Sequence, residues 1–352
     1  MPLLGRTEEA RAGPTASGEV VRNLAPVSGA TPTVCLQPRV YLWCGGTIGE
    51  EDSVRYGLSL PNFGGGTDAR TMAELACEAE EAGWDGFFVW DHLLAFSPGP
   101  VPVVDPWVAL TAAALSTSGI RLGPMVTPLP RRRPVKLARE TVSLDRLSGG
   151  RLTLGVGIGA MPFEYDYLGE EPDMRTRGAM LDEGLEVLTG LWSGEPFEYR
   201  GEHYRIGGET PHEDWRAVFY PPPLQHPRIP VWVAGTWPAR PPFRRAARWD
   251  GAFPMKVEDG RVAPMTPEDA REVARYVEGH RTNDGPPFDL VVAGETPGED
   301  GKEGARTVAA YEEAGVTWWI ESIDPWRFGW TEGEPWPSQE MRHRVRQGPP
   351  RA

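Results

Sequence analysis

Phe87-Phe88-Val89-Trp90-Asp91-His92 is the stretch that decides the fold of this chain. Four apolar residues run into an acid and an imidazole, and a loop rich in Pro and Gly follows from Leu93 to Pro106. A short, continuous apolar run is typical of a strand that is buried on both faces, as in a parallel sheet. In a barrel of parallel strands, the emerging carboxyl end of each strand is where catalytic side chains lie.

The pattern around this strand repeats along the chain. Short apolar runs alternate with helical periodicity, and one helix places Leu181, Leu185, Leu188 and Trp192 on one face. We expect strands at Tyr56–Pro61, Phe87–Val89, Arg121–Thr127, Arg151–Gly157, Ile229–Ala234, Gly251–Phe253, Asp289–Ala293 and Val316–Ile320. Eight such units predict an α/β fold of the (β/α)8 TIM-barrel type. An open doubly wound sheet is the alternative, but the first strand lacks the G-x-G-x-x-G turn of a Rossmann sheet.

Composition bounds the function. The 352 residues carry a formal net charge of −14, which disfavours binding to nucleic acid. No apolar run is long enough for a membrane span, and no secretory signal pattern opens the chain. Cys35, Cys44 and Cys77 show no metal-ligand spacing, and the six His are scattered, so no metal is expected. A reduced, cytoplasmic setting fits these features.

The domain prediction has three parts. Residues 1–53 are rich in Ala, Gly, Pro, Ser and Thr without periodicity, and we read them as a disordered extension. An alternative is that translation starts at Val54, because Gly49-Glu50-Glu51 would be encoded by purine-rich codons. Residues 54–324 form the barrel, with an insertion at 193–228 between the fourth and fifth strands. Residues 325–352 are expected to be a C-terminal tail.

Asp91 and His92 are the leading catalytic candidates. Imidazole can exchange a proton near neutral pH, and Asp91 could orient the ring. An ordinary loop turn with an exposed His is the structural alternative.

Other candidate residues lie in loops that could bind a cofactor. Gly155, Gly157 and Gly159 after the fourth strand would let backbone come close to a ligand, or would only form a flexible strand exit. Gly235, Thr236 and Arg240 precede a helix and could hold a phosphate, or could be a capped helix with a solvated basic face. The run Arg131-Arg132-Arg133 faces either an anion or solvent. Pro124-Met125 inside the third strand predicts an irregular backbone.

The ordered set of motifs resembles the bacterial luciferase-like flavin oxidoreductases. The most specific are Leu144-Asp145-Arg146-Leu147-Ser148-Gly149-Gly150-Arg151 and Arg245-Ala246-Ala247-Arg248-Trp249-Asp250-Gly251. The resemblance covers roughly residues 55–324 and implies a flavin at the carboxyl ends of the strands. It implies a cis peptide bond before Met125 that supports the flavin ring, with Asn62, His92, Val126 and Thr127 near the ring. It also implies the three glycines beside the ribityl chain, and Gly235, Thr236 and Arg240 at the phosphate.

Three functions remain open on this resemblance. The leading one is a monooxygenase that uses reduced FMN and O2 on a small organic substrate, with a separate flavin reductase and a homodimeric state as expectations. The second is a dehydrogenase or reductase that uses a deazaflavin (coenzyme F-420). Several deazaflavin members have an acid just after the glycine run, where this chain has Ala160-Met161-Pro162 before Glu164. The third is a flavin-binding protein without turnover. The insertion at 193–228, with six aromatic residues, is expected to be the lid over an apolar substrate. These aromatic residues are Phe197, Tyr199, Tyr204, Trp215, Phe219 and Tyr220.

Overall fold

A computed structural model describes residues 54–95, 99–208, 217–282 and 287–351. The predictions for residues 1–53, including the alternative start, lie outside the described residues, and so does Trp215. Within the described residues, no helix is long and apolar enough to cross a membrane.

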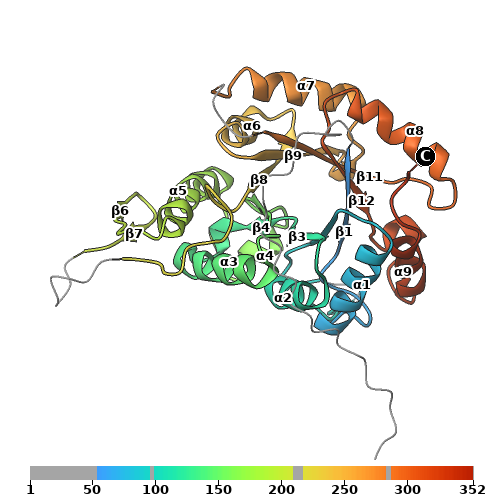
Figure 1. Ribbon diagram of the computed structural model, residues 1–352, viewed down its shortest axis with the longest axis horizontal. Coiled ribbons are helices and arrows are strands. Elements are labelled where there is room, and N and C mark those ends of the chain that lie inside the picture. Colours follow the sequence, from blue (N-terminus) through green and yellow to red (C-terminus); the bar gives the residue numbers. More distant parts are fainter. Residues whose placement is uncertain (1–53, 96–98, 209–216, 283–286, 352) are drawn as a thin grey trace, which may run out of the picture. The chain divides into compact units, whose positions relative to one another are not determined.

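Parallel strands close into a barrel (Figure 1). They are β1 (Arg55–Leu60), β2 (Gly86–Val89), β3 (Arg121–Pro124), β4 (Thr127–Pro128), β5 (Leu154–Gly157), β8 (Val231–Trp237), β9 (Gly251–Glu258), β11 (Asp289–Gly294) and β12 (Trp318–Ser322). Hydrogen-bonded neighbours run in the order β3-β2-β1-β12-β11-β9-β8-β5-β4. Because β3 and β4 are two halves of one strand, this order returns to its start, and the predicted (β/α)8 barrel is confirmed. A short β10 (Arg261–Ala263) pairs antiparallel with the end of β9.

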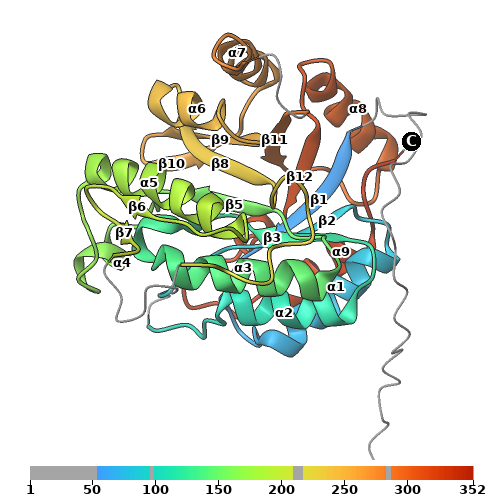
Figure 2. The same ribbon diagram turned by 60° about the vertical axis from the view of Figure 1, so that its left-hand side comes forward.

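Helices follow the strands and surround the barrel (Figure 2). They are α1 (Ala69–Glu81), α2 (Pro106–Ser116), α3 (Pro134–Ser148), α5 (Met174–Trp192), α6 (Arg240–Ala246), α7 (Pro267–Glu278), α8 (Gly301–Glu312) and α9 (Ser338–Arg346), with a short α4 (Phe163–Asp166) and 3-10 turns η1 (Leu129–Arg131) and η2 (Trp326–Phe328). Local sequence sets their ends. Asp68 caps α1 by accepting from the Thr71 amide, Thr266 and Asp269 form a capping box on α7, and Gly149 ends α3 in the left-handed conformation.

The segment expected to be a C-terminal tail contains α9, the helix that follows the eighth strand. Arg342 of α9 bonds to Glu78 of α1, and the Trp84 indole donates to the Val345 carbonyl at 2.8 Å. Met341 and Val345, four residues apart, are its buried apolar residues. The polar composition of this helix hid it from the sequence pattern, because only one narrow face is apolar.

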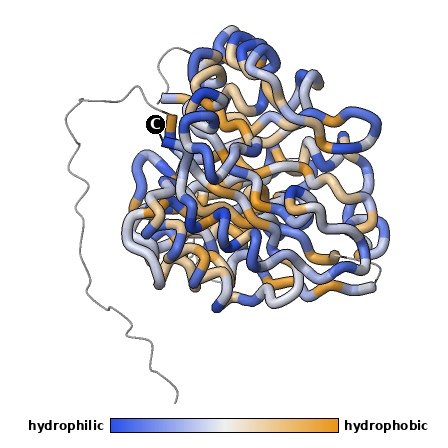
Figure 3. Tube along the Cα trace, turned by 90° about the vertical axis from the view of Figure 1, so that its right-hand side faces the viewer, coloured by the Kyte–Doolittle hydropathy of each residue, from blue (hydrophilic) through white to orange (hydrophobic). Residues whose placement is uncertain are grey.

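Two hydrophobic clusters form the core. One fills the barrel interior with Phe88, Met125, Trp232, Ala234, Phe253, Val291, Trp318 and Ile320. The Trp232 ring lies 5.3 Å from both the Phe88 and the Trp318 rings, so side chains of β2, β8 and β12 meet across the lumen. The other, larger cluster packs the helices on the outside of the sheet. In Figure 3 hydrophobic segments gather in the middle of the barrel, and hydrophilic ones lie toward the outside.

The insertion at 193–228 does not lie where a lid was expected. It begins where α5 ends and stops where β8 begins, so both its ends are at the amino ends of the strands. The Gln225 amide, for example, donates to the Leu152 carbonyl just before β5. Its hairpin of β6 (Tyr199–Arg200) and β7 (Arg205–Ile206) lies beside α5 (Figures 1 and 2). There Glu183 accepts three hairpin amides. The lid prediction is wrong for the described part of the insertion, because catalytic loops follow strands and this segment follows a helix.

Candidate active site

A bulge interrupts the third strand at the carboxyl end of the barrel. The Met125 amide still donates to the Val89 carbonyl at 2.8 Å, which keeps Met125 in register with β2. The chain leaves the ladder only after this bond, and the Met125–Val126 peptide is cis. The predicted irregularity is therefore present, but the cis bond follows Met125 instead of preceding it.

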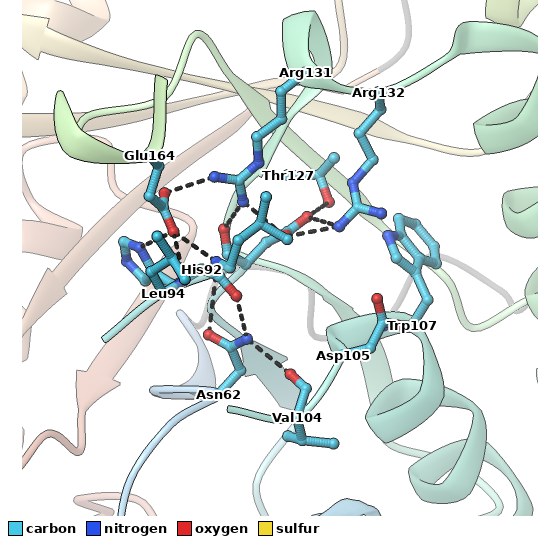
Figure 4. A network of polar contacts seen from close by, with 12 residues as sticks. Asn62, His92, Leu94, Val104, Asp105, Trp107, Thr127, Arg131, Arg132 and Glu164 are labelled. Atoms are coloured by element: carbon cyan, nitrogen blue, oxygen red, sulfur yellow. Dashed lines mark hydrogen bonds and ion pairs between the residues drawn. The ribbon is translucent and has the colours of Figure 1, made fainter. Parts of the chain in front are cut away.

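Asp91 is the centre of a buried ion network, and Figure 4 labels its partners Thr127, Arg131 and Arg132. Its carboxylate accepts from Arg132 at 2.7 and 2.8 Å, from Arg131 at 3.0 Å and from the Thr127 hydroxyl at 2.8 Å. Because side chains alternate along a strand, Asp91 points away from the lumen that Phe88 fills. Asp91 thus ties the end of β2 to the turn after β4, and its predicted catalytic role becomes a positioning role. Arg131 and Arg132 face neither solvent nor a free anion, since both are paired with Asp91.

Asn62, expected beside a flavin ring, is fully buried and clamps two loops together (Figure 4). Its amide nitrogen donates to the His92 and Val104 carbonyls, both at 2.8 Å. Its oxygen accepts from the His92 amide at 3.0 Å. Both donor hydrogens are therefore used within the protein, and Asn62 fixes the backbone of His92.

His92 is held by an acid that the sequence did not assign to the site. The Nδ1 atom lies 3.4 Å from Oε1 of Glu164, and the His92 side chain is 20% exposed whereas that of Glu164 is 2% exposed. The same Glu164 accepts the Leu93 amide at 2.5 Å and pairs with Arg131 at 2.5 Å (Figure 4). A carboxylate at Nδ1 orients the ring and favours a proton on that nitrogen, so Nε2 is left as the acceptor.

The charges around Glu164 fix its ionisation. Burial acts to raise its pKa, but the bond to His92, the Arg131 charge and the Leu93 amide outweigh burial and lower the pKa to about 2. For Arg131, burial acts to lower the pKa, and the charges of Asp91 and Glu164 raise it overall. Glu164 is therefore a permanent anion at neutral pH. It anchors His92 and does not itself exchange protons.

The predicted glycines have structural reasons of their own. A Cβ on Gly155 would lie 2.3 Å from the Pro124 carbonyl oxygen, and one on Gly157 would lie 3.0 Å from the Val126 side chain. A Cβ on Gly159, which has φ 85°, would clash with the Tyr165 hydroxyl. These glycines make room for the bulge and for α4.

The loop expected to bind the phosphate has fewer backbone donors than an ordinary helix start. In α6, Pro241 and Pro242 occupy the first turn, so two amide donors of the helix start are missing. Gly235 has no room for a side chain, because a Cβ there would lie 2.2 Å from the Pro242 side chain. Thr236 is exposed at the end of β8, and the Arg240 guanidinium lies over the Trp237 ring at 4.0 Å. Arg245, another basic residue of α6, is not available to a phosphate in the same way, because it is bonded to Asp182.

The inward positions at the carboxyl ends of the strands are of mixed size. By alternation from the interior cluster, they include the small residues Ser59, Gly157, Ala293 and Ser322. They also include Trp90, Thr236 and Met255. These side chains lie above a floor of Phe88, Trp232 and Trp318 rings, at the end of the barrel where His92 lies.

Comparisons with known proteins identify the family of this chain. Residues 54–343 match the family described as luciferase-like monooxygenase. The oxygenase component of the flavin-dependent trigonelline monooxygenase of Acinetobacter baylyi is 31% identical over 168 residues, 47% of this chain and 43% of the relative. The F420-dependent glucose-6-phosphate dehydrogenase of Gordonia bronchialis is 34% identical over 176 residues, 49% of this chain and 48% of the relative. The chain spans about half the length of the curated relatives it matches.

Solved structures share the fold at low identity. The F420-dependent tetrahydromethanopterin reductase of Methanopyrus kandleri has a TM-score of 0.59 at 17% identity, over 84% of this chain and 96% of the reductase. The oxygenating constituent of 3,6-diketocamphane monooxygenase from Pseudomonas putida, in complex with FMN, has a TM-score of 0.54 at 22% identity, over 69% and 67% of the chains. With a match over most of its length and the same barrel, the chain belongs to the luciferase-like monooxygenase family, whose members include flavin- and F420-dependent oxidoreductases.

Proposed function

We propose that this protein is an FMN-dependent monooxygenase that acts on a small organic substrate. The observation that carries the proposal is His92, fixed by Glu164 at Nδ1, on a loop whose Asp91 is bonded to Thr127 just after the Met125–Val126 bulge. Reduced FMN, when bound, would supply the electrons and the reaction with O2, and the protein supplies position and proton handling.

The flavin ring would rest on Met125 and Val126 above the aromatic floor. Gly155, Gly157 and Gly159 would border the ribityl chain, as the family resemblance implies. The phosphate would meet the Thr236 hydroxyl near Gly235 and the Arg240 guanidinium. The roles of Asn62, Asp91 and Thr127 would be indirect, since their side chains hold the loops that carry His92.

His92 would donate or accept a proton through Nε2. An imidazole is a suitable proton carrier near neutral pH, and the Glu164 carboxylate holds this ring in one orientation. Because the ring is fixed after the end of β2, its Nε2 atom would stay directed at a substrate that lies over the flavin.

A deazaflavin-dependent dehydrogenase is the second candidate. The observation that favours it is Glu164, an acid after the glycine run that lies in the site, together with the Gordonia bronchialis relative. The charge balance supports FMN instead. F420 carries acidic glutamates beyond its phosphate, and two of the arginines near the expected phosphate loop, Arg245 and Arg248, are already paired with Asp182.

Isotope labelling separates the two candidates. The protein is supplied with reduced FMN from a flavin reductase and isotopically labelled O2, and an organic compound library is screened by mass spectrometry. We expect a product that contains one labelled oxygen atom. A product formed only with F420, without labelled oxygen, would establish the dehydrogenase and reject the monooxygenase.

A further inference from the structure

Six aromatic side chains, one of them His92, gather at the carboxyl end of the barrel, and we name them the aromatic enclosure. The members are Phe63, Trp90, His92, Trp326, Trp330 and Trp336. Neighbouring rings have centroids 5.3–6.3 Å apart and form a closed circuit from His92 through the tryptophans to Phe63 and back. Three of the six come from the segment after β12 that the sequence suggested was a tail.

Glycines in the β1–α1 loop allow this segment to dock. Gly64 has φ 133°, and a Cβ there would lie 2.3 Å from the Trp336 ring. The Ser338 hydroxyl donates to the Gly65 carbonyl at 3.2 Å, and the Trp330 indole donates to the Glu334 carbonyl at 3.0 Å. The three tryptophans are therefore held in place by named contacts, and they do not form a loose surface patch.

The enclosure borders the site through Trp90 and His92. Trp90 points inward, since its indole donates to the inward hydroxyl of Ser59 at 2.8 Å, and its ring lies 5.9 Å from that of His92. Trp326 lies nearly parallel to Trp90 at 15° and is 54% exposed. Trp90 therefore joins the exposed Trp326 ring to His92.

Two carboxylates lie at the same end of the barrel without a cationic partner. Glu295, which is exposed, and Asp324, which is half-buried, follow β11 and β12, and both continue the inward positions of those strands. Among the described residues, no Lys, Arg or His nitrogen lies within 4.0 Å of either carboxylate. Asp324 accepts only the Trp326 and Arg327 amides. Burial raises the pKa of both acids, and the Arg327 charge opposes this.

The arginines near these acids are committed elsewhere. Arg327 donates to Glu321 at 2.7 Å and to the Ser322 and Thr296 carbonyls. Arg131 and Arg132 are paired with Asp91 and Glu164 on the other side of the site. Arg344 also lies 3.3 Å from Glu321, so Glu321, Glu295 and Asp324 outnumber Arg327 and Arg344 by one carboxylate. The ring faces of the enclosure add the negative side of their quadrupoles.

We propose that the aromatic enclosure binds a flat organic cation, so that the substrate class is a positively charged heteroaromatic or aryl-ammonium compound. The indole faces would stack on the flat ring and attract its charge, and Glu295 and Asp324 would supply the counter-charge. This inference deepens the proposed function, because it relies on that function only for calling the bound cation a substrate.

Binding of two isosteric probes tests the inference without turnover. The full chain, with and without saturating FMN, is titrated with N-methylpyridinium and with toluene, and binding is followed by saturation-transfer NMR. The two probes have the same shape, and only the first is charged. FMN binding is measured separately by flavin fluorescence in the same samples, so a failure of the cofactor proposal is seen independently.

We expect N-methylpyridinium to bind at least about fivefold tighter than toluene, as a cation–π contribution would give. Glu295→Gln should remove most of that difference and leave toluene binding unchanged, and Asp324→Asn should act in the same direction. Trp326→Ala should weaken both probes. Tyr220→Ala and Glu268→Gln, exposed residues on the insertion and on α7, serve as controls and should change neither. Equal binding of the two probes, or a charge preference that survives both Glu295→Gln and Asp324→Asn, would overturn the inference.

Discussion

The Nδ1 atom of His92 lies 3.4 Å from Oε1 of Glu164, and the backbone of His92 is clamped by Asn62. The imidazole is thus fixed through its ring and through its main chain. Removing the ring should abolish proton transfer without unfolding the barrel. We expect His92→Ala to keep the circular dichroism spectrum and to lower turnover of a screened substrate by about 100-fold or more. His280→Ala, at an exposed position just after α7, is the matched control, and equal activity of both variants would remove His92 from the mechanism.

Glu164 should make the stability of the protein depend on pH in the acid range. Its folded pKa is lowered to about 2, below its ordinary value, so the carboxylate stabilises the folded state fully above about pH 4.5. That contribution is lost as the pH falls from about 4.5 to about 2. Glu164→Gln should lower the free energy of unfolding by about 1–3 kcal/mol at pH 7. Urea titrations at a series of pH values should show the gap from the wild-type protein closing through that window, and a constant gap would contradict the assigned pKa.

Asn62 should behave as a clamp and not as a cofactor ligand. Asn62→Ala removes three buried hydrogen bonds and should cost about 2–4 kcal/mol of stability. Asn62→Asp should cost more, because a carboxylate oxygen would face the His92 and Val104 carbonyls. Thermal unfolding gives the first quantity and FMN titration tests the alternative. A large loss of FMN affinity with unchanged stability would show that Asn62 contacts the flavin.

Gly155 should tolerate no side chain, even without a ligand. Gly155→Ala would place Cβ 2.3 Å from the Pro124 carbonyl oxygen, so the strand must shift, at a cost of about 1–3 kcal/mol. At Gly119, where a Cβ would have an ordinary contact at 3.6 Å, the same change serves as the control. Chemical denaturation of the protein without cofactor measures both. Equal stability of the two variants would mean that the glycine serves the ligand alone.

The barrel could be predicted from the sequence because each buried parallel strand reads as a short apolar run. Side-chain roles could be predicted less well. The pattern placed Asp91 at a strand end but not its direction, which alternation with Phe88 turns away from the lumen. Glu164 was visible as an acid, but its contact with His92 joins residues 72 positions apart and depends on α4. The sequence pattern assigned Trp326, Trp330 and Trp336 to a tail. Their segment packs against Gly64 and Gly65, which lie near the start of the barrel and far away in the sequence.

The end of β8 gives a direct test of the cofactor's anchor. Thr236 and Arg240 are the proposed phosphate contacts, and the prolines of α6 leave few amides to replace them. Thr236→Val keeps the shape and removes the hydroxyl, and Arg240→Gln removes the charge. We expect each to weaken FMN binding about tenfold and to leave riboflavin, which lacks the phosphate, unaffected. Parallel losses for riboflavin would show that these residues act on the fold.

The central claim is that this barrel binds FMN at the carboxyl ends of its strands. A titration of the purified chain with FMN and with F420, each oxidised and reduced, tests it by flavin absorbance and fluorescence. We predict saturable binding of reduced FMN that is tighter than that of F420 and is weakened by Thr236→Val. Binding of F420 alone, or binding of neither cofactor, would contradict the account.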